Sequence, residues 1–121
     1  MTEKKTILFV DDEQKILDGL RRMLRPMRHQ WRVALAAGGE EALEKLDRAD
    51  FDVIVSDMRM PGMDGAQLLT EVQERYPQIV RIVLSGYAEV SQAVRAVGVA
   101  HQFLSKPCDS ERLQRIIERA L

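Results

Sequence analysis

The chain has 121 residues, 45% of them hydrophobic, and its 18 basic and 19 acidic side chains leave a formal net charge of −1. This length suits one domain with a single core, and the lack of a basic excess argues against direct binding to nucleic acid or to an anionic membrane. The single cysteine, Cys108, excludes an internal disulfide bond and fits a reducing compartment. The first twelve residues hold no apolar run long enough for a signal peptide or a membrane span, so we expect a cytoplasmic location.

Five apolar runs predict buried strands. Runs without polar alternation are typical of parallel strands that are covered on both faces of a sheet. Most of them end abruptly at charged, polar or glycine residues, and the second, which opens with Trp31, is the weakest. The runs comprise residues 6–10, 31–37, 53–55, 80–84 and 100–104.

Apolar residues at helical spacing follow each of these runs. Pro26, the dipeptide Tyr76-Pro77 and Gly98 mark helix ends, and Asp64 is a candidate N-cap. The apolar positions of the five expected helices are Ile16, Leu17, Leu20, Met23 and Leu24; Ala42, Leu43 and Leu46; Ala66, Leu68, Leu69 and Val72; Val90, Ala93, Val94 and Val97; and Leu113, Ile116, Ile117 and Leu121.

The alternation of five strands with five helices predicts an α/β fold. It is typical of a doubly wound (βα)5 parallel sheet with helices on both faces. Right-handed crossovers and the short chain favour the strand order 2-1-3-4-5. No linker, repeat or low-complexity tract interrupts the pattern, so we expect residues 1–121 to form a single domain.

Polar residues follow four of the five expected strands. In such a sheet the working site lies at the carboxyl ends of the strands, near the switch point between the first and third strands. Asp11 and Asp12 follow the first strand and Asp57 follows the third, while Ser85 and Lys106 follow the fourth and fifth. We therefore expect these side chains to converge on one edge of the sheet.

Three carboxylates at one place repel each other unless a cation joins them. Oxygen ligands suit Mg²⁺, which takes a few carboxylates together with water and substrate oxygens. We interpret Asp12 as a direct ligand, Asp11 as a ligand through water and Asp57 as the donor of one oxygen. The backbone carbonyl of Arg59 is expected to fill another position.

Asp57 is interpreted as a nucleophile that accepts a phosphoryl group. Carboxylate nucleophiles that form aspartyl phosphates are established in enzymes, and phosphoryl transfer depends mainly on positioning and charge neutralisation. Lys106 supplies a mobile positive charge for the incoming oxygens. Ser85 is expected to donate a hydroxyl hydrogen bond to one of them.

Four motifs together make the sequence resemble a receiver domain of two-component response regulators. They are FVDDE at 9–13, SDMRMPGMDG at 56–65, LSG at 84–86 and FLSKP at 103–107. The resemblance implies that a histidine kinase or a histidine phosphotransfer protein phosphorylates Asp57 in a Mg²⁺-dependent reaction. It also implies a cis peptide bond between Lys106 and Pro107 and a signalling domain rather than an enzyme.

The resemblance further implies a conformational switch. Ser85 shifts toward the phosphoryl group and Phe103 turns inward, although Phe103 lacks the hydroxyl of the tyrosine common at its position. The surface of the fourth helix, fifth strand and fifth helix then controls an output domain or a protein partner, or forms a phosphorylation-dependent homodimer. Arg59 and Tyr87 are expected to tune the lifetime of the phosphoryl group and to keep self-hydrolysis slow.

Three other functions remain open at this stage. A phosphatase with an aspartyl nucleophile usually carries a second acid at the position of Arg59, and Asp11-Asp12 would repel the phosphate of a bound flavin. A non-phosphorylated scaffold of the receiver type is the main alternative. The chain is either a free-standing receiver or the N-terminal part of a longer regulator.

Two further clusters have a plain and a functional interpretation. The three methionines between residues 58 and 63 are interpreted as loop packing, with a docking surface as the alternative. Arg21, Arg22, Arg25 and Arg28 are interpreted as the solvated face of the first helix, with a kinase-docking surface as the alternative.

Overall fold

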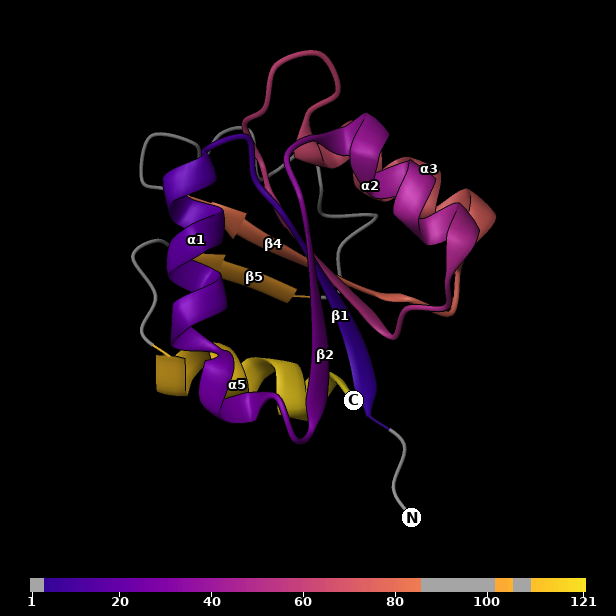
Figure 1. The fold of residues 1–121 in the computed structure, drawn as a ribbon. Coiled ribbons are helices and arrows are strands. Elements are labelled where there is room, and N and C mark those ends of the chain that lie inside the picture. The colour runs from indigo at the N-terminus through magenta and orange to yellow at the C-terminus, as the bar shows by residue number, and fades with distance from the viewer. Residues whose placement is uncertain (1–3, 86–101, 106–109) are drawn as a thin grey trace.

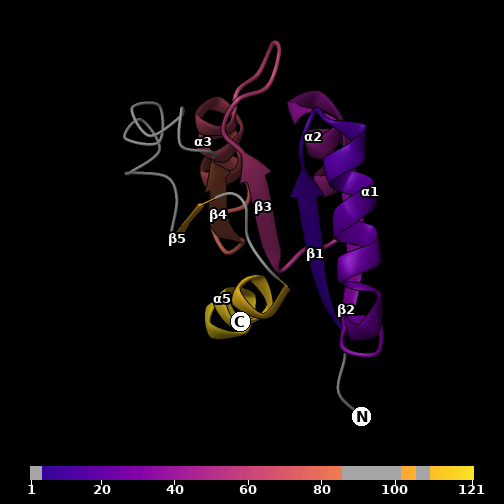
Figure 2. The same ribbon diagram turned by 90° about the vertical axis from the view of Figure 1, so that its left-hand side faces the viewer.

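The computed structural model describes residues 4–85, 102–105 and 110–121, with Ser85, the 102–105 segment and Ser110 described by their backbone alone. A five-stranded sheet forms its centre, and every neighbouring pair of strands is parallel (Figures 1 and 2). The strand order is β2-β1-β3-β4-β5, which confirms the order predicted from the sequence. The strands are β1 (Lys5–Val10), β2 (Trp31–Ala36), β3 (Val53–Asp57), β4 (Val80–Ser85) and β5 (Gln102–Ser105).

Helices cover both faces of the sheet. Helices α1 and α5 pack on one face, and α2 and α3 pack on the other (Figure 1). The fourth expected helix, with its apolar positions between 90 and 97, lies outside the described residues. The described helices are α1 (Gln14–Met23), the 3-10 turn η1 (Arg25–Met27), α2 (Gly39–Arg48), α3 (Gly65–Arg75) and α5 (Ser110–Ala120).

The side chains of β1 show why its sequence has no polar alternation. Successive side chains of a strand point to opposite faces, and here both faces are covered. Ile7 and Phe9 pack with α1 and α5, whereas Leu8 and Val10 pack with α2 and α3. All four are at most 2% exposed, so burial of apolar area on both faces stabilises the strand.

Some predicted boundaries were wrong by a few residues. The third strand continues through Ser56 to Asp57, and the fifth continues to Ser105, while the predicted start of the fifth strand at residue 100 lies outside the described residues. Leu121 was expected on the apolar face of the last helix. It lies one residue beyond the end of α5 at Ala120, and it is 43% exposed although its amide still donates to the Ile117 carbonyl at 3.1 Å.

The loop after β3 packs through its methionines. Met58 and Met60 are buried, and Met63 packs partly against the same core, which confirms that these residues serve loop packing. Met63 also explains Gly39 at the start of α2, because a Cβ atom on this glycine would lie 2.7 Å from the Met63 sulfur. The N-terminus of α2 therefore rests directly on this loop.

Arg81 is a charged residue that the apolar pattern of β4 did not reveal. It is only 6% exposed, and its guanidinium donates hydrogen bonds to the backbone carbonyls of Ile79 at 3.0 Å and Pro77 at 3.2 Å. Burial removes water from the charged form and so lowers the pKa of the Arg81 guanidinium.

Within the described residues, no helix has both the length and the apolar character needed to cross a bilayer.

Helix α3 begins with a capping box at Asp64, which confirms the predicted N-cap. The Asp64 carboxylate accepts a hydrogen bond from the Gln67 backbone amide at 2.8 Å, and the Gln67 side chain accepts one from the Asp64 amide at 3.0 Å. These two bonds satisfy amides that the first turn of a helix leaves without partners.

The substitution Asp64→Ala is expected to lower the free energy of unfolding by about 1 kcal/mol, because the first turn of α3 loses its cap. Urea denaturation followed by circular dichroism measures this change. The control Asp50→Ala alters an exposed aspartate and should stay within about 0.5 kcal/mol of the wild type. Equal losses in the two variants would contradict a capping role for Asp64.

Candidate functional site

Two neighbouring strands bring three aspartates to one edge of the sheet. Asp57 is the last residue of β3, and Asp11 and Asp12 directly follow β1. Val10 of β1 lies opposite Ser56 of β3, so the next residues along, Asp11 and Asp57, leave the sheet at the same level. Figure 2 shows the arrowheads of β1 and β3 pointing to this common edge.

The three carboxylates form a compact cluster. Oxygen atoms of Asp11, Asp12 and Asp57 lie within 4.8 Å of one another. Asp11 is 2% exposed and Asp57 is 4% exposed, whereas Asp12 is exposed to solvent. Three carboxylates this close together repel one another, and nearby positive charge reduces that repulsion.

Hydrogen bonds fix the backbone on both sides of the cluster. The Asp11 amide donates to the Ala36 carbonyl at 3.1 Å, and the Asp11 carboxylate accepts from the Glu13 amide at 2.9 Å. The Ser56 hydroxyl donates to the Asp57 carbonyl at 2.9 Å. The cluster therefore stands on a backbone that is held in place before any ligand binds.

Gly65 is a positioning residue that sequence reasoning missed. A Cβ atom on Gly65 would lie 2.5 Å from the Asp57 carbonyl oxygen and 2.9 Å from the Met58 Cα. Its amide donates to the Met58 carbonyl at 2.9 Å. Only glycine allows the first turn of α3 to approach the end of β3 this closely, and its place between the capping aspartate and an apolar helix was the available signal.

The structure places only some of the remaining candidate residues. Arg59 lies in the loop after β3 and is exposed. Ser85 ends β4 at the same edge, one residue beyond the pair Asp57 and Leu84. Phe103 belongs to β5, although its side chain is not described, and the structure does not describe Tyr87 and Lys106 or the Lys106–Pro107 bond.

The donor atoms of the cluster suit a hard cation. All three side chains offer carboxylate oxygens, and among the described residues no histidine or cysteine joins them. Such a set matches Mg²⁺ better than zinc, which favours nitrogen and sulfur ligands. An acid at the end of a buried strand, next to two further acids, is an arrangement that could hold a cation.

The comparisons with known proteins agree with this geometry. The family model of the response regulator receiver domain matches residues 7–118. The parallel sheet of order 2-1-3-4-5 and the acid cluster at its edge define the class of protein. The chain belongs to the response regulator receiver domain family of two-component systems. Receiver domains of this family are signalling domains that bind Mg²⁺ at an acidic pocket and act with kinases and output domains.

Curated relatives are transcriptional regulators. The hydrogenase transcriptional regulatory protein HoxA of Cupriavidus necator is 39% identical over all of this chain and 25% of its own length. The transcriptional regulatory protein ZraR of Escherichia coli is 37% identical over 95% of this chain and 26% of its own length. The chain thus spans about a quarter of the length of these relatives.

Solved structures share the whole fold. The signal receiver domain of an HD domain-containing protein from Pseudomonas fluorescens superimposes with a TM-score of 0.91, at 29% identity over 98% of this chain and 94% of its own. The response regulator TrrA of Thermotoga maritima, in complex with Mg²⁺-BeF, gives a TM-score of 0.84 at 26% identity, over 97% and 99% of the two chains.

The substitution Asp12→Asn is expected to raise the free energy of unfolding by about 1 kcal/mol in the absence of divalent cations. The substitution removes one of three negative charges that lie within 4.8 Å of one another. Charges at this separation repel by about 1 kcal/mol, and the neutral asparagine removes that repulsion. Urea denaturation in a chelating buffer at neutral pH measures the change. The control Asp50→Asn removes an equal charge at an exposed site away from the cluster, and a similar gain there would refute the interpretation.

The substitution Gly65→Ala is expected to lower the free energy of unfolding by about 1–3 kcal/mol, because the new methyl group collides with backbone atoms of β3. The control is Gly19→Ala in the middle of α1, where a Cβ atom would meet nothing within 4 Å. That control should stabilise the protein by about 0.5–1 kcal/mol. A neutral Gly65→Ala in the same denaturation assay would contradict the close approach.

Proposed function

We propose that this chain is a receiver domain that accepts a phosphoryl group on Asp57 from a histidine kinase or a histidine phosphotransfer protein. The observation that supports this most strongly is the cluster of three carboxylates within 4.8 Å at the end of two buried strands. A buried Asp57 at the last position of a rigid strand is a pre-oriented nucleophile.

Mg²⁺ fits the donor atoms of the cluster. We propose that Asp11, Asp12 and Asp57, together with the backbone carbonyl of Arg59, hold this ion. When bound, it neutralises negative charge on the cluster and on the incoming phosphoryl oxygens. The oxygen-only ligand set and the exposure of Asp12, which leaves the cluster open to solvent, support this assignment.

In the proposed reaction an Asp57 carboxylate oxygen attacks the phosphorus atom. A bond between that oxygen and phosphorus forms, the bond between phosphorus and the donor imidazole nitrogen breaks, and the electron pair of the broken bond stays with the imidazole. Lys106 is proposed to pair with a phosphoryl oxygen, and Ser85 to donate a hydrogen bond to another. Hydrolysis later returns Asp57 to its free carboxylate.

The signal is proposed to leave the site through Ser85 and Phe103. Their reorientation would bias the α5 side of the sheet toward a state that binds an output domain, a protein partner or a second copy. Arg59 and Tyr87 would cover the acyl phosphate and slow the attack of water. Residues 1–121 are proposed as one receiver domain that contacts no nucleic acid itself and controls its output through a partner or an attached domain.

A phosphorylation assay tests this function. Incubation with acetyl phosphate and Mg²⁺ is expected to add the mass of one phosphoryl group to the intact protein, and Asp57→Asn should abolish the addition. The control Asp50→Asn, at an exposed site, should leave uptake unchanged. A chelator should reduce uptake by at least about tenfold, because charge neutralisation by the cation is lost.

The outcome separates the receiver from a non-phosphorylated scaffold. Phosphoryl uptake by Asp57→Asn at the wild-type level would contradict the proposal, and so would uptake that a chelator does not reduce. A wild-type protein that takes up no phosphoryl group, even at high acetyl phosphate concentration, would favour the scaffold.

A further inference from the structure

A second polar feature lies between α1, η1 and β2. It is a surface pocket of about 260 Å³ lined by Arg21, Leu24, Arg25, Arg28, Trp31 and Val33. We call it the arginine pocket. It belongs to a different part of the molecule from the three acids, and the proposed phosphoryl transfer does not use it.

The arginine pocket has a cationic rim and an apolar floor. Arg21, Arg25 and Arg28 are exposed and follow one another at helical spacing. Leu24 and Trp31 form the floor and are 2% and 4% exposed. A ligand that combines negative charge with apolar side chains complements both features at once.

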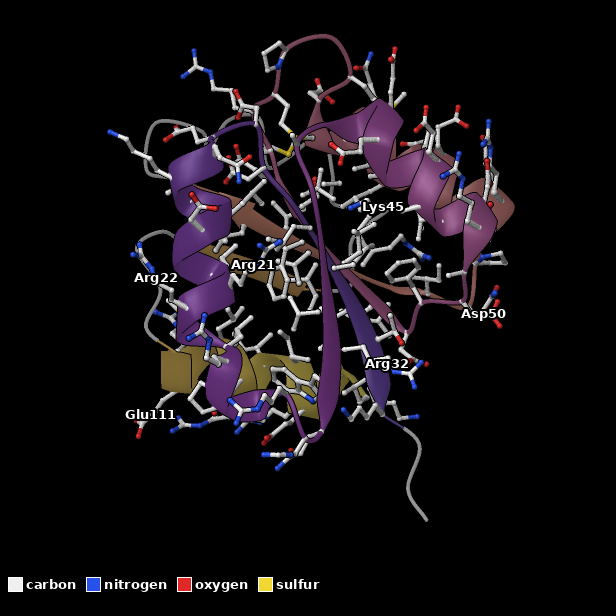
Figure 3. The ribbon with its side chains drawn as sticks, in the orientation of Figure 1. Arg21, Arg22, Arg32, Lys45, Asp50 and Glu111 are labelled. Carbon is white, nitrogen blue, oxygen red and sulfur yellow. The ribbon has the colours of Figure 1, made fainter. Side chains whose placement is uncertain are left out.

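The orientation of the side chains distinguishes the rim from the rest of α1. Figure 3 shows Arg21 between α1 and β2, whereas Arg22 lies on the outer side of the helix. Arg22 does not line the pocket. The adjacent arginines Arg21 and Arg22 therefore provide a natural contrast between pocket and open surface.

The rim arginines lack partners among the described residues. In that part of the chain, neither an ion pair nor a side-chain hydrogen bond involves Arg21, Arg25 or Arg28. By contrast, Arg75 pairs with Glu71 and Asp47, and Lys45 pairs with Glu41. Three neighbouring cations without a counter-charge repel one another and attract an anionic group.

A second pocket extends this basic surface. It has a volume of about 500 Å³ and shares Trp31 with the arginine pocket. Lys4, Lys5 and His29 contribute to it, with Glu118 as its acidic side chain. Because both pockets have Trp31 in their linings, we refer to the two together as the groove, and a ligand that contacts both must be larger than a single small anion.

We propose that this groove binds an acidic peptide segment of a partner protein, with carboxylates on the arginines and an aliphatic side chain on the apolar floor. Exposed arginines hold a lone anion weakly because water screens them, whereas a peptide that covers Leu24 and Val33 excludes that water. Trp31 is buried and offers no open ring face on which a base of single-stranded nucleic acid would stack.

The groove lies at the opposite edge of the sheet from the acids. Lys5 and Trp31 are the first residues of β1 and β2, while Asp57 is the last residue of β3. A donor histidine that reaches Asp57 works at the other end of the parallel strands (Figure 2). The peptide is therefore a ligand distinct from the phosphoryl donor, and its binding does not require the chemistry at Asp57.

Peptide titration tests the proposal. The probe is a fluorescein-labelled short peptide of alternating glutamate and leucine, and the control peptide carries glutamine in place of glutamate. Trp31 is the only tryptophan and lines both pockets, so its emission reports binding at the groove itself. We expect saturable binding of the acidic probe, a change in Trp31 emission, and at least tenfold weaker binding of the control peptide.

A pair of charge-matched variants locates the site. Arg25→Glu/Arg28→Glu is expected to weaken binding of the acidic probe at least tenfold, and Arg25→Gln/Arg28→Gln should weaken it less. Arg22→Glu/Arg48→Glu makes the same change in net charge on exposed residues outside the pocket and should stay within twofold of the wild type. Thermal unfolding shows whether each variant is folded. If the glutamate variant is not folded, the binding of the glutamine variant is used to test the site.

Several results would overturn the proposal. They are no saturable binding to the wild type, equal losses in the pocket and control variants, or displacement of the probe by inorganic phosphate or single-stranded DNA at the probe's own concentration. Asp57→Asn should bind the probe normally. If the peptide does not bind, the proposed phosphorylation of Asp57 is not contradicted. If Asp57 is not phosphorylated, the proposed peptide binding is not contradicted.

Discussion

Repulsion among three carboxylates at the carboxyl edge of β1 and β3 is the constraint on which the site depends. Asp11 and Asp57 are nearly fully buried, so water does little to screen them. The fold holds them there because both strands are apolar on both faces and because Gly65 lets α3 press against the end of β3. The stability of the sheet thus maintains a cluster of negative charge whose repulsion a bound cation would relieve.

Much of this arrangement was predictable from the sequence. Apolar runs that alternate with helices predicted a parallel sheet, right-handed crossovers and the short chain favoured the strand order, and the acids after the runs predicted the edge that carries the site. Gly65 was missed because a close approach of two backbones is a tertiary fact. Arg81 was missed because its partners are backbone carbonyls, and the placement of Leu121 was wrong because periodicity gives the face of a helix but not how much of its last residue the core covers.

Clusters of opposite charge lie at the two edges of the sheet. Acids gather where β1 and β3 end, and arginines and lysines gather where β1 and β2 begin. The net charge of −1 does not reveal this separation, because it sums all 18 basic and 19 acidic side chains of the chain. If both proposals hold, separate recognition surfaces at the two ends of the parallel strands would let one domain receive a phosphoryl group and hold a protein partner without either ligand blocking the other.

Reductive trapping tests the central proposal most directly. Borohydride converts an acyl phosphate, but not a free carboxylate, into an alcohol, so peptide mass spectrometry after treatment with acetyl phosphate locates the modified residue. The account predicts homoserine at position 57 alone, formed with Mg²⁺ and suppressed by a chelator. Homoserine at position 11 or 12 instead, or no conversion at position 57 in protein that has gained phosphoryl mass, would contradict it.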